Sequence, residues 1–189
     1  MSEQYLLPVK DILTSSQNLN FDASAYLKTL ADQFQVSCTI NHPLDVSVHL
    51  EALNSGILVR GTLDGIVTLI CDRCAEDYEQ KIAANFESFE ANPENEQDHE
   101  VNIKASEPFE PLETRIILDA KNNLVLDLGA ILWEEFLLAL PLKPLCSENC
   151  QGICPKCGTN LNLSSCNCKK EEGDPRLAIL RNIKIKPKK

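Results

Sequence analysis

Cysteines carry the clearest chemistry in this chain. Six of the nine cysteines fall within the 23 residues from 146 to 168. The centre of this cluster reads Cys154-Pro155-Lys156-Cys157-Gly158, and a glycine in this place can adopt the positive φ that a tight turn needs. Such a turn aims two sulfur atoms at one point, and two more thiolates complete a tetrahedral zinc site. We therefore expect a structural zinc ion bound by four of these six: Cys146, Cys150, Cys154, Cys157, Cys166 and Cys168.

Disulfide bonds and a redox or iron–sulfur role are the alternatives for this cluster. Disulfides need an oxidising compartment. The first residues, Met1 to Pro8, contain neither the basic start nor the apolar run of a signal peptide, so we expect a cytoplasmic protein. The odd total of nine cysteines also fits a disulfide framework poorly. Zinc is therefore the preferred interpretation.

A second pair, Cys71-Asp72-Arg73-Cys74, follows a predicted strand. It could supply half of a metal site, act as a thioredoxin-like redox pair, or consist of reduced thiols with a structural role. A redox pair belongs at a helix N-terminus, whereas this pair leads into another predicted strand. If Cys38 is set aside as a small buried residue, eight cysteines remain, which is enough for two four-thiolate sites.

The sequence offers no catalytic constellation. The three histidines, His42, His49 and His99, fall in a predicted turn, a strand and an acidic loop. Four thiolates leave no open position on zinc for a water molecule. We therefore expect no enzyme and no small-molecule substrate. A membrane span is not expected either, because the best apolar run, 128–140, is short and contains two glutamates.

Charge is strongly segregated along the chain, whose net charge is −10. Residues 87–113 contain nine acids and one base, whereas residues 169–189 contain eight bases and three acids. A uniformly acidic chain binds phosphate backbones poorly, but a basic tail can reach them. The candidate nucleic-acid contacts are Arg181, Lys184, Lys186, Lys188 and Lys189.

The middle of the chain predicts an antiparallel β-meander. Apolar residues alternate in 44–50, and strands are also predicted at 57–63, 65–71 and 78–89. The links Asn54-Ser55-Gly56 and Asp64-Gly65 have the composition of hairpin turns.

Helices and short strands are predicted on both sides of this meander. Residues 5–13 suggest an opening strand, and residues 21–34 a helix with Asp22 as its N-cap. Short strands are expected at 116–119 and 124–126. Asp127 should then cap a helix over 128–140, which is apolar on nearly all sides and should be well buried, with Trp133 and Phe136 in the core. Asp174-Pro175-Arg176 has the form of a helix start.

Together these patterns predict an α+β fold: an antiparallel β-meander core with a few packed helices and a small C-terminal zinc-binding module. We divide the chain into an α+β domain over residues 1–143, with an acidic loop at 91–111, and a second part over residues 144–189. The second part contains the cysteine-rich zinc module, a short helix and the basic tail.

Three landmarks in the sequence carry a family resemblance. The first is Cys71-Asp72-Arg73-Cys74 after a hairpin, and the second is Asp127 with a helix that runs into Leu138-Ala139-Leu140-Pro141. The third is the most specific: Cys146-x3-Cys150-x-Gly152-Ile153-Cys154-Pro155-x-Cys157-Gly158-x-Asn160-Leu161-Asn162, then Cys166-x-Cys168 and Asp174-Pro175-Arg176-Leu177. Taken together, from about residue 44 to the C-terminus, they resemble the YceD family of large ribosomal RNA subunit accumulation proteins, in which leucine is usual where Ile153 stands.

The resemblance implies a non-enzymatic ribosome-biogenesis factor that supports synthesis, processing or stability of 23S ribosomal RNA. Its expected partners are ribosomal RNA, large-subunit ribosomal proteins, or both. Some relatives have the first cysteine pair but lack the C-terminal cysteines, which argues against one metal shared by the two groups. The alternative functions are a zinc-ribbon protein–protein adaptor or regulator without RNA contact, which the net charge of −10 favours, and a thiol oxidoreductase, which rests on Cys71 and Cys74 alone.

Overall fold

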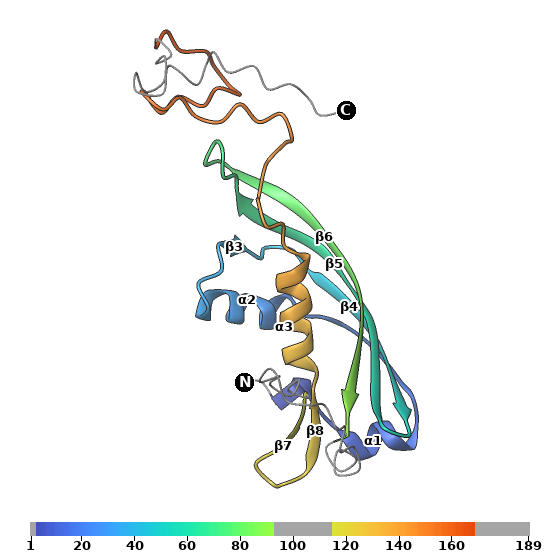
Figure 1. Cartoon of the computed structure of the whole chain (residues 1–189). Coiled ribbons are helices and arrows are strands. Elements are labelled where there is room, and N and C mark those ends of the chain that lie inside the picture. Colours follow the sequence, from blue (N-terminus) through green and yellow to red (C-terminus); the bar gives the residue numbers. More distant parts are fainter. Residues whose placement is uncertain (1–2, 93–114, 169–189) are drawn as a thin grey trace, which may run out of the picture.

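The computed structural model describes residues 3–92 and 115–168, and its main feature is a long, curved antiparallel sheet (Figure 1). The three strands of the predicted meander are β4 (Leu44–Leu53), β5 (Gly56–Ile70) and β6 (Asp77–Ala91). The strand β2 (Gln17–Asp22) extends the sheet beyond β4. The short β3 (Cys38–Thr39) pairs with Leu69 and Thr68 near the end of β5. The α+β class and the antiparallel meander are confirmed.

The predicted break at Asp64 and Gly65 is wrong, because β5 continues through both residues. A Cβ atom at Gly65 would overlap the Leu44 side chain and lie 2.8 Å from the Pro43 carbonyl oxygen. Glycine is therefore required here because the neighbouring strand approaches closely. A glycine inside a strand can mark such an approach as well as a turn. The Asn54-Ser55 turn between β4 and β5 is as expected.

A second, three-stranded sheet has the order β1-β8-β7 and contains β1 (Leu6–Pro8), β7 (Ile116–Leu118) and β8 (Leu124–Asp127). The two short strands predicted after residue 115 are thus confirmed. The expected opening strand is confirmed only at Leu6–Pro8. A 3-10 turn (Glu3–Tyr5) precedes it, and the helix α1 (Val9–Thr14) follows it and buries Val9 and Ile12.

The helix predicted from residue 21 begins later, as α2 (Ser24–Gln33). Phe21 and Asp22 end strand β2, where they pair with Val46 and Asp45. The Asp22 carboxylate still accepts a hydrogen bond from the Ser24 backbone N–H at 2.8 Å, and it accepts a second from the Leu44 N–H at 3.1 Å. Asp22 therefore joins the start of α2 to the sheet, although it lies one residue outside the cap position.

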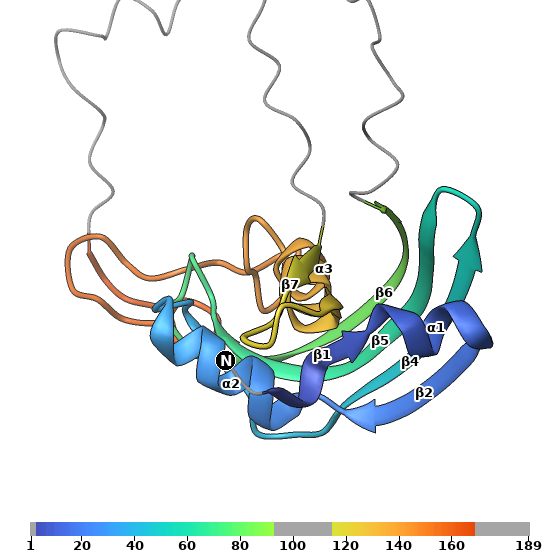
Figure 2. The same ribbon diagram turned by 90° about the horizontal axis from the view of Figure 1, so that it is seen from below.

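The helix α3 (Leu128–Ala139) lies inside the curve of the main sheet (Figure 2). Its predicted cap is confirmed, because Asp127 Oδ1 accepts from the Ala130 N–H at 2.9 Å. Phe136 is fully buried, as predicted for the core, and Trp133 is half-buried. The expectation that this helix is well buried is confirmed on one side only, because Leu138 is 72 % exposed. One helix on one concave face can bury one side only, so the opposite side faces outward.

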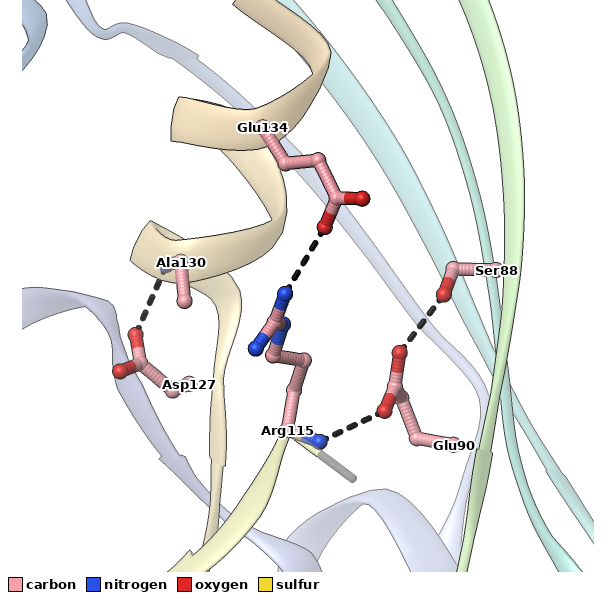
Figure 3. Close-up of polar contacts among 6 residues, drawn as sticks. All are labelled: Ser88, Glu90, Arg115, Asp127, Ala130 and Glu134. Atoms are coloured by element: carbon pink, nitrogen blue, oxygen red, sulfur yellow. Dashed lines mark hydrogen bonds and ion pairs between the residues drawn. The ribbon is translucent and has the colours of Figure 1, made fainter. Parts of the chain in front are cut away.

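A buried carboxylate ties β6 to the small sheet and to α3. Glu90 accepts from the Ser88 hydroxyl at 2.6 Å and from the Arg115 backbone N–H at 2.7 Å (Figure 3). The Arg115 guanidinium in turn donates to Glu134 on α3 at 2.9 Å. A buried acid needs such partners to offset its lost hydration. The network therefore holds the start of β7 against the end of β6.

Several predictions fall outside the described residues: most of the acidic loop at 91–111, the helix start at Asp174-Pro175, and the basic tail. Within residues 3–92 and 115–168, no helix is long and apolar enough to cross a membrane.

The two sides of α3 should respond very differently to truncation. Phe136→Ala should lower the free energy of unfolding by about 3–5 kcal/mol, because it leaves a cavity in a packed core. Leu138→Ala, on the exposed side, should change that free energy by about 0.5 kcal/mol or less. Urea unfolding followed by far-UV circular dichroism would measure both. Equal losses in the two variants would show that α3 is not seated on the sheet as described.

Candidate metal centres

Eight of the nine cysteines gather into two groups of four, and within each group all four Sγ atoms lie within 4.8 Å of one another. We name them by their position relative to the sheet. The proximal tetrad contains Cys71, Cys74, Cys146 and Cys150. The distal tetrad contains Cys154, Cys157, Cys166 and Cys168. The six clustered cysteines thus divide two and four, and the Cys71/Cys74 pair lies with the upstream two.

The sulfur spacing fits a tetrahedral metal ion. With Zn–S bonds of about 2.3 Å, the sulfur atoms of a four-thiolate site lie about 3.8 Å apart. In the proximal tetrad, Cys71 Sγ lies 3.8 Å from Cys150 Sγ, and Cys74 Sγ lies 3.7 Å from Cys146 Sγ. These separations are far longer than the S–S bond of about 2.0 Å in a disulfide. All nine cysteines, which lie within the described residues, are free thiols.

The proximal tetrad forms where the link between β5 and β6 meets the C-terminal segment, drawn in orange at the top of Figure 1. The link is a tight turn in which the Ala75 N–H donates to the Cys71 carbonyl, and Ala75 has a φ of 57°. This turn brings Cys71 and Cys74 to the same side. Both are buried, as is Cys150, whereas Cys146 is exposed. The pair lies between two strands and not at a helix start, so no helix dipole acts on its thiols.

Arg73 joins the two halves of the proximal tetrad. Its guanidinium donates to the carbonyl oxygens of Glu148 and Cys150 at 3.0 and 3.1 Å. Its own carbonyl accepts from the Ile153 N–H at 3.1 Å. Gly152, with a φ of 74°, passes so close that a Cβ atom would lie 3.0 Å from this carbonyl oxygen. In the sequence, the only signal of this role is the place of Arg73 inside a Cys-x-x-Cys pair.

The distal tetrad is built on the turn that the sequence predicts. Gly158 has a φ of 72°, and its N–H donates to the Cys154 carbonyl at 2.9 Å. The Cys154 N–H in turn donates to the Thr159 carbonyl at 2.9 Å. Cys154 is buried, Cys166 and Cys168 are half-buried, and Cys157 is exposed. The distal tetrad is therefore the more solvent-accessible of the two.

In each tetrad the thiols differ in acidity. Burial raises the pKa of Cys71, but hydrogen bonds from the backbone N–H groups of Cys146, Cys74 and Arg73 outweigh it and lower the pKa to about 6. The neighbouring Cys150 thiolate, with burial, raises the pKa of Cys146 to about 12. Without a metal ion, therefore, the tetrad holds thiolates and protonated thiols together, because four adjacent negative charges repel one another.

The distal tetrad shows the same division. The Thr159 hydroxyl and backbone N–H lower the pKa of Cys157 to about 6. The Cys157 thiolate raises the pKa of Cys168 to about 12. A divalent cation would replace the remaining protons in each group, since the thiolate is the form that binds metal. Both tetrads can therefore hold a metal ion, and four thiolates with no open position suit a structural ion.

The family model described as large ribosomal RNA subunit accumulation protein YceD matches residues 59–184, a range that includes both tetrads. An uncharacterized protein of Mycobacterium tuberculosis (strain ATCC 25618 / H37Rv) is 28% identical over 137 residues, which cover 72% of this chain and 60% of that protein. No solved structure matches the chain significantly.

Two plant relatives have names that describe a role. The Arabidopsis thaliana protein named large ribosomal RNA subunit accumulation protein YCED homolog 1, chloroplastic, is 23% identical over 156 residues, 75% of this chain and 49% of that protein. The Zea mays protein of the same name is 28% identical over 143 residues, 67% of this chain and 49% of that protein. The chain thus spans about half to three-fifths of the length of the relatives it matches. The match to the family model covers well over half of the residues of this chain, and the chain therefore belongs to the YceD family.

Proposed function

We propose that this chain is a non-enzymatic factor that supports the accumulation of large-subunit ribosomal RNA, the 23S species in bacteria. The observation that carries the proposal is the family match over residues 59–184. The tetrads agree with it, because a metal ion with four thiolate ligands stabilises the structure and has no open coordination position for catalysis. In this proposal, the chain acts by binding ribosomal RNA, large-subunit ribosomal proteins, or both.

We propose further that each tetrad binds one Zn²⁺ ion. Residues 144–168 have few buried apolar side chains of their own, and Cys150 and Cys154 are among the buried ones. The segment therefore depends on metal ligation for its shape, since zinc binding free energy acts as folding free energy. The proximal ion would hold the C-terminal segment against the link between β5 and β6, because two ligands come from each.

Direct contact with a protein is a second candidate mode of action, and the outer side of α3 favours it. We call this region the α3 outer surface; it contains Phe34 and Leu138, which are 57 % and 72 % exposed, with Leu137 and the half-buried Trp133. A hollow of about 640 Å³ adjoins it, with Tyr5, Tyr26, Asp22 and Asp127 in its lining. Such apolar surface marks interaction sites in many proteins. An adaptor without RNA contact would use it.

Charge distinguishes the two modes. The described residues carry 18 acidic and 9 basic side chains, so they attract a basic ribosomal protein more readily than a phosphate backbone. RNA contact would therefore use the basic tail after residue 168, with Arg181, Lys184, Lys186, Lys188 and Lys189 as the proposed contacts.

The reduced chain should bind two zinc ions, and Cys71→Ser and Cys157→Ser should each lower this number to one. Cys38→Ser, a matched substitution outside both tetrads, should leave two. Native mass spectrometry and elemental analysis would count the ions. A single ion in the unmodified chain would contradict the proposal, and bound iron with visible absorbance would replace it with an iron–sulfur centre.

Zinc binding should also release protons, at least two for each ion at pH 7. The pKa values of Cys74 and Cys146 are raised in the proximal tetrad, and those of Cys166 and Cys168 in the distal one, so these thiols are protonated before the metal binds. Affinity should therefore fall by about 100-fold or more for each pH unit below 7. Calorimetry in buffers of different ionisation enthalpy would count the protons. Zinc affinity that is independent of pH would rule out thiolate ligation.

Affinity purification of the tagged chain from its own cells, with and without ribonuclease, tests the function. We expect large-subunit ribosomal RNA or its precursors, together with large-subunit proteins. If proteins persist after ribonuclease, Leu138→Ser should reduce them several-fold. Leu13→Ser, a matched change at an exposed leucine on α1, should not. Recovery of neither ribosomal RNA nor ribosomal proteins would contradict the proposed function.

A further inference from the structure

The two tetrads meet through a pair of short backbone segments. Residues 151–154 directly follow the proximal ligand Cys150, and residues 159–162 lie between the distal ligands Cys157 and Cys166. Ile153 and Asn160 form an antiparallel bridge. The Leu161 N–H donates to the Gly152 carbonyl at 2.8 Å. A movement of the distal loop is therefore transmitted to the residues beside Cys150.

Asn162 makes the direct connection to a metal-binding sulfur. Its side-chain amide Nδ2 donates to Cys150 Sγ at 3.3 Å, and its Oδ1 accepts from the Gln151 backbone N–H at 2.7 Å. The orientation of this amide is determined by chemistry. A backbone N–H can only donate, so Oδ1 must face Gln151 and the N–H₂ group must face the sulfur.

Asn160 holds Asn162 in this orientation. Its Oδ1 accepts from both the backbone N–H and the side-chain N–H₂ of Asn162, each at 2.9 Å. Its own N–H₂ donates at 3.3 Å to the carboxylate of Glu76, the last residue of the link between β5 and β6. The Asn160-Leu161-Asn162 segment therefore contacts the Cys150 sulfur, the backbone beside it and the link between β5 and β6.

We propose that Asn162 is a positioning residue that couples the two metal sites, so that an ion in the distal tetrad strengthens binding in the proximal one. An ion on Cys157 and Cys166 orders the loop between them and presents the Asn162 amide to Cys150. A hydrogen bond to a ligand sulfur offsets the negative charge of four thiolates and orients that ligand, as outer partners of metal ligands do elsewhere. Because coupling between binding sites is reciprocal, the proximal ion strengthens the distal site equally.

This inference rests on the proposed zinc binding and is independent of the proposed role in RNA accumulation. Its consequence is that residues 144–168 fold and bind both metal ions in one cooperative step. Loss of either ion would then loosen both sites, including the ligands that attach the segment to the sheet.

The test uses Co²⁺ as a spectroscopic probe of four-thiolate sites in the reduced full chain. In the unmodified chain, native mass spectrometry during titration should show mainly metal-free and two-metal species. Asn162→Asp keeps the acceptor for the Gln151 N–H but cannot donate to the sulfur. It should weaken proximal binding by about 10–100-fold and make one-metal species accumulate. Asn149→Asp adds the same charge at an exposed position one residue before Cys150, and it should preserve the two-metal pattern.

A double-mutant cycle separates coupling from simple damage. Cys157→Ser should weaken the proximal site by about tenfold, and adding Asn162→Asp to it should weaken that site little further, because the hydrogen bond is already lost. The coupling would be overturned if each substitution weakened the proximal site by its full factor in the double variant. It would also be overturned if one-metal species accumulated in the unmodified chain. Either result would leave the two zinc sites in place. Binding of fewer than two ions by the unmodified chain would instead refute the zinc assignment itself.

Discussion

The convergence of four thiols from two distant parts of the chain is the constraint on which the C-terminal half depends. Cys71 and Cys74 belong to the link between β5 and β6, and Cys146 and Cys150 follow α3. The described elements between the two pairs must therefore bring them together. The fully buried Phe136 and the capped start of α3 satisfy this requirement, because they seat the helix on the sheet and direct its C-terminal end toward the link.

The two tetrads differ in what a bound metal ion would stabilise. The proximal tetrad joins two pieces of structure, and its ligands Cys71, Cys74 and Cys150 are buried. The distal tetrad shapes a short loop that has little apolar surface to bury. A segment of this kind gains stability from ligation where a larger one would gain it from a core. Arg73 and Asn162 supply the hydrogen bonds that keep carbonyl groups and a sulfur satisfied around these centres.

Three carboxylates among the described residues make contacts that hold the fold together. The carboxylates Asp22, Glu90 and Asp127 all accept backbone N–H groups, and Glu90 also joins β6 to Arg115. These three carboxylates therefore stabilise the fold. The α3 outer surface is different, because Leu138 and Phe34 remain exposed, although the Phe34 ring stacks on Trp133 with the centroids 5.5 Å apart.

Local patterns in the sequence were enough to predict most elements of the fold. The alternation in β4, the cap at Asp127 and the turn at Gly158 each depend on residues close together in the chain, and the structure confirms them. The family resemblance was also visible from spaced motifs. These features follow from backbone sterics and short-range hydrogen bonds, which neighbouring residues determine by themselves.

Tertiary structure decided how the parts meet. The sequence could not say which cysteines share a site, because sulfur atoms 72 and 79 residues apart come together only after α3 has packed on the sheet. Nor could it show that Gly65 permits a close approach inside β5, or that Leu138 stays exposed on an otherwise apolar helix. Each of these depends on which distant surface lies opposite a residue, and that information belongs to the packed chain and not to its local sequence.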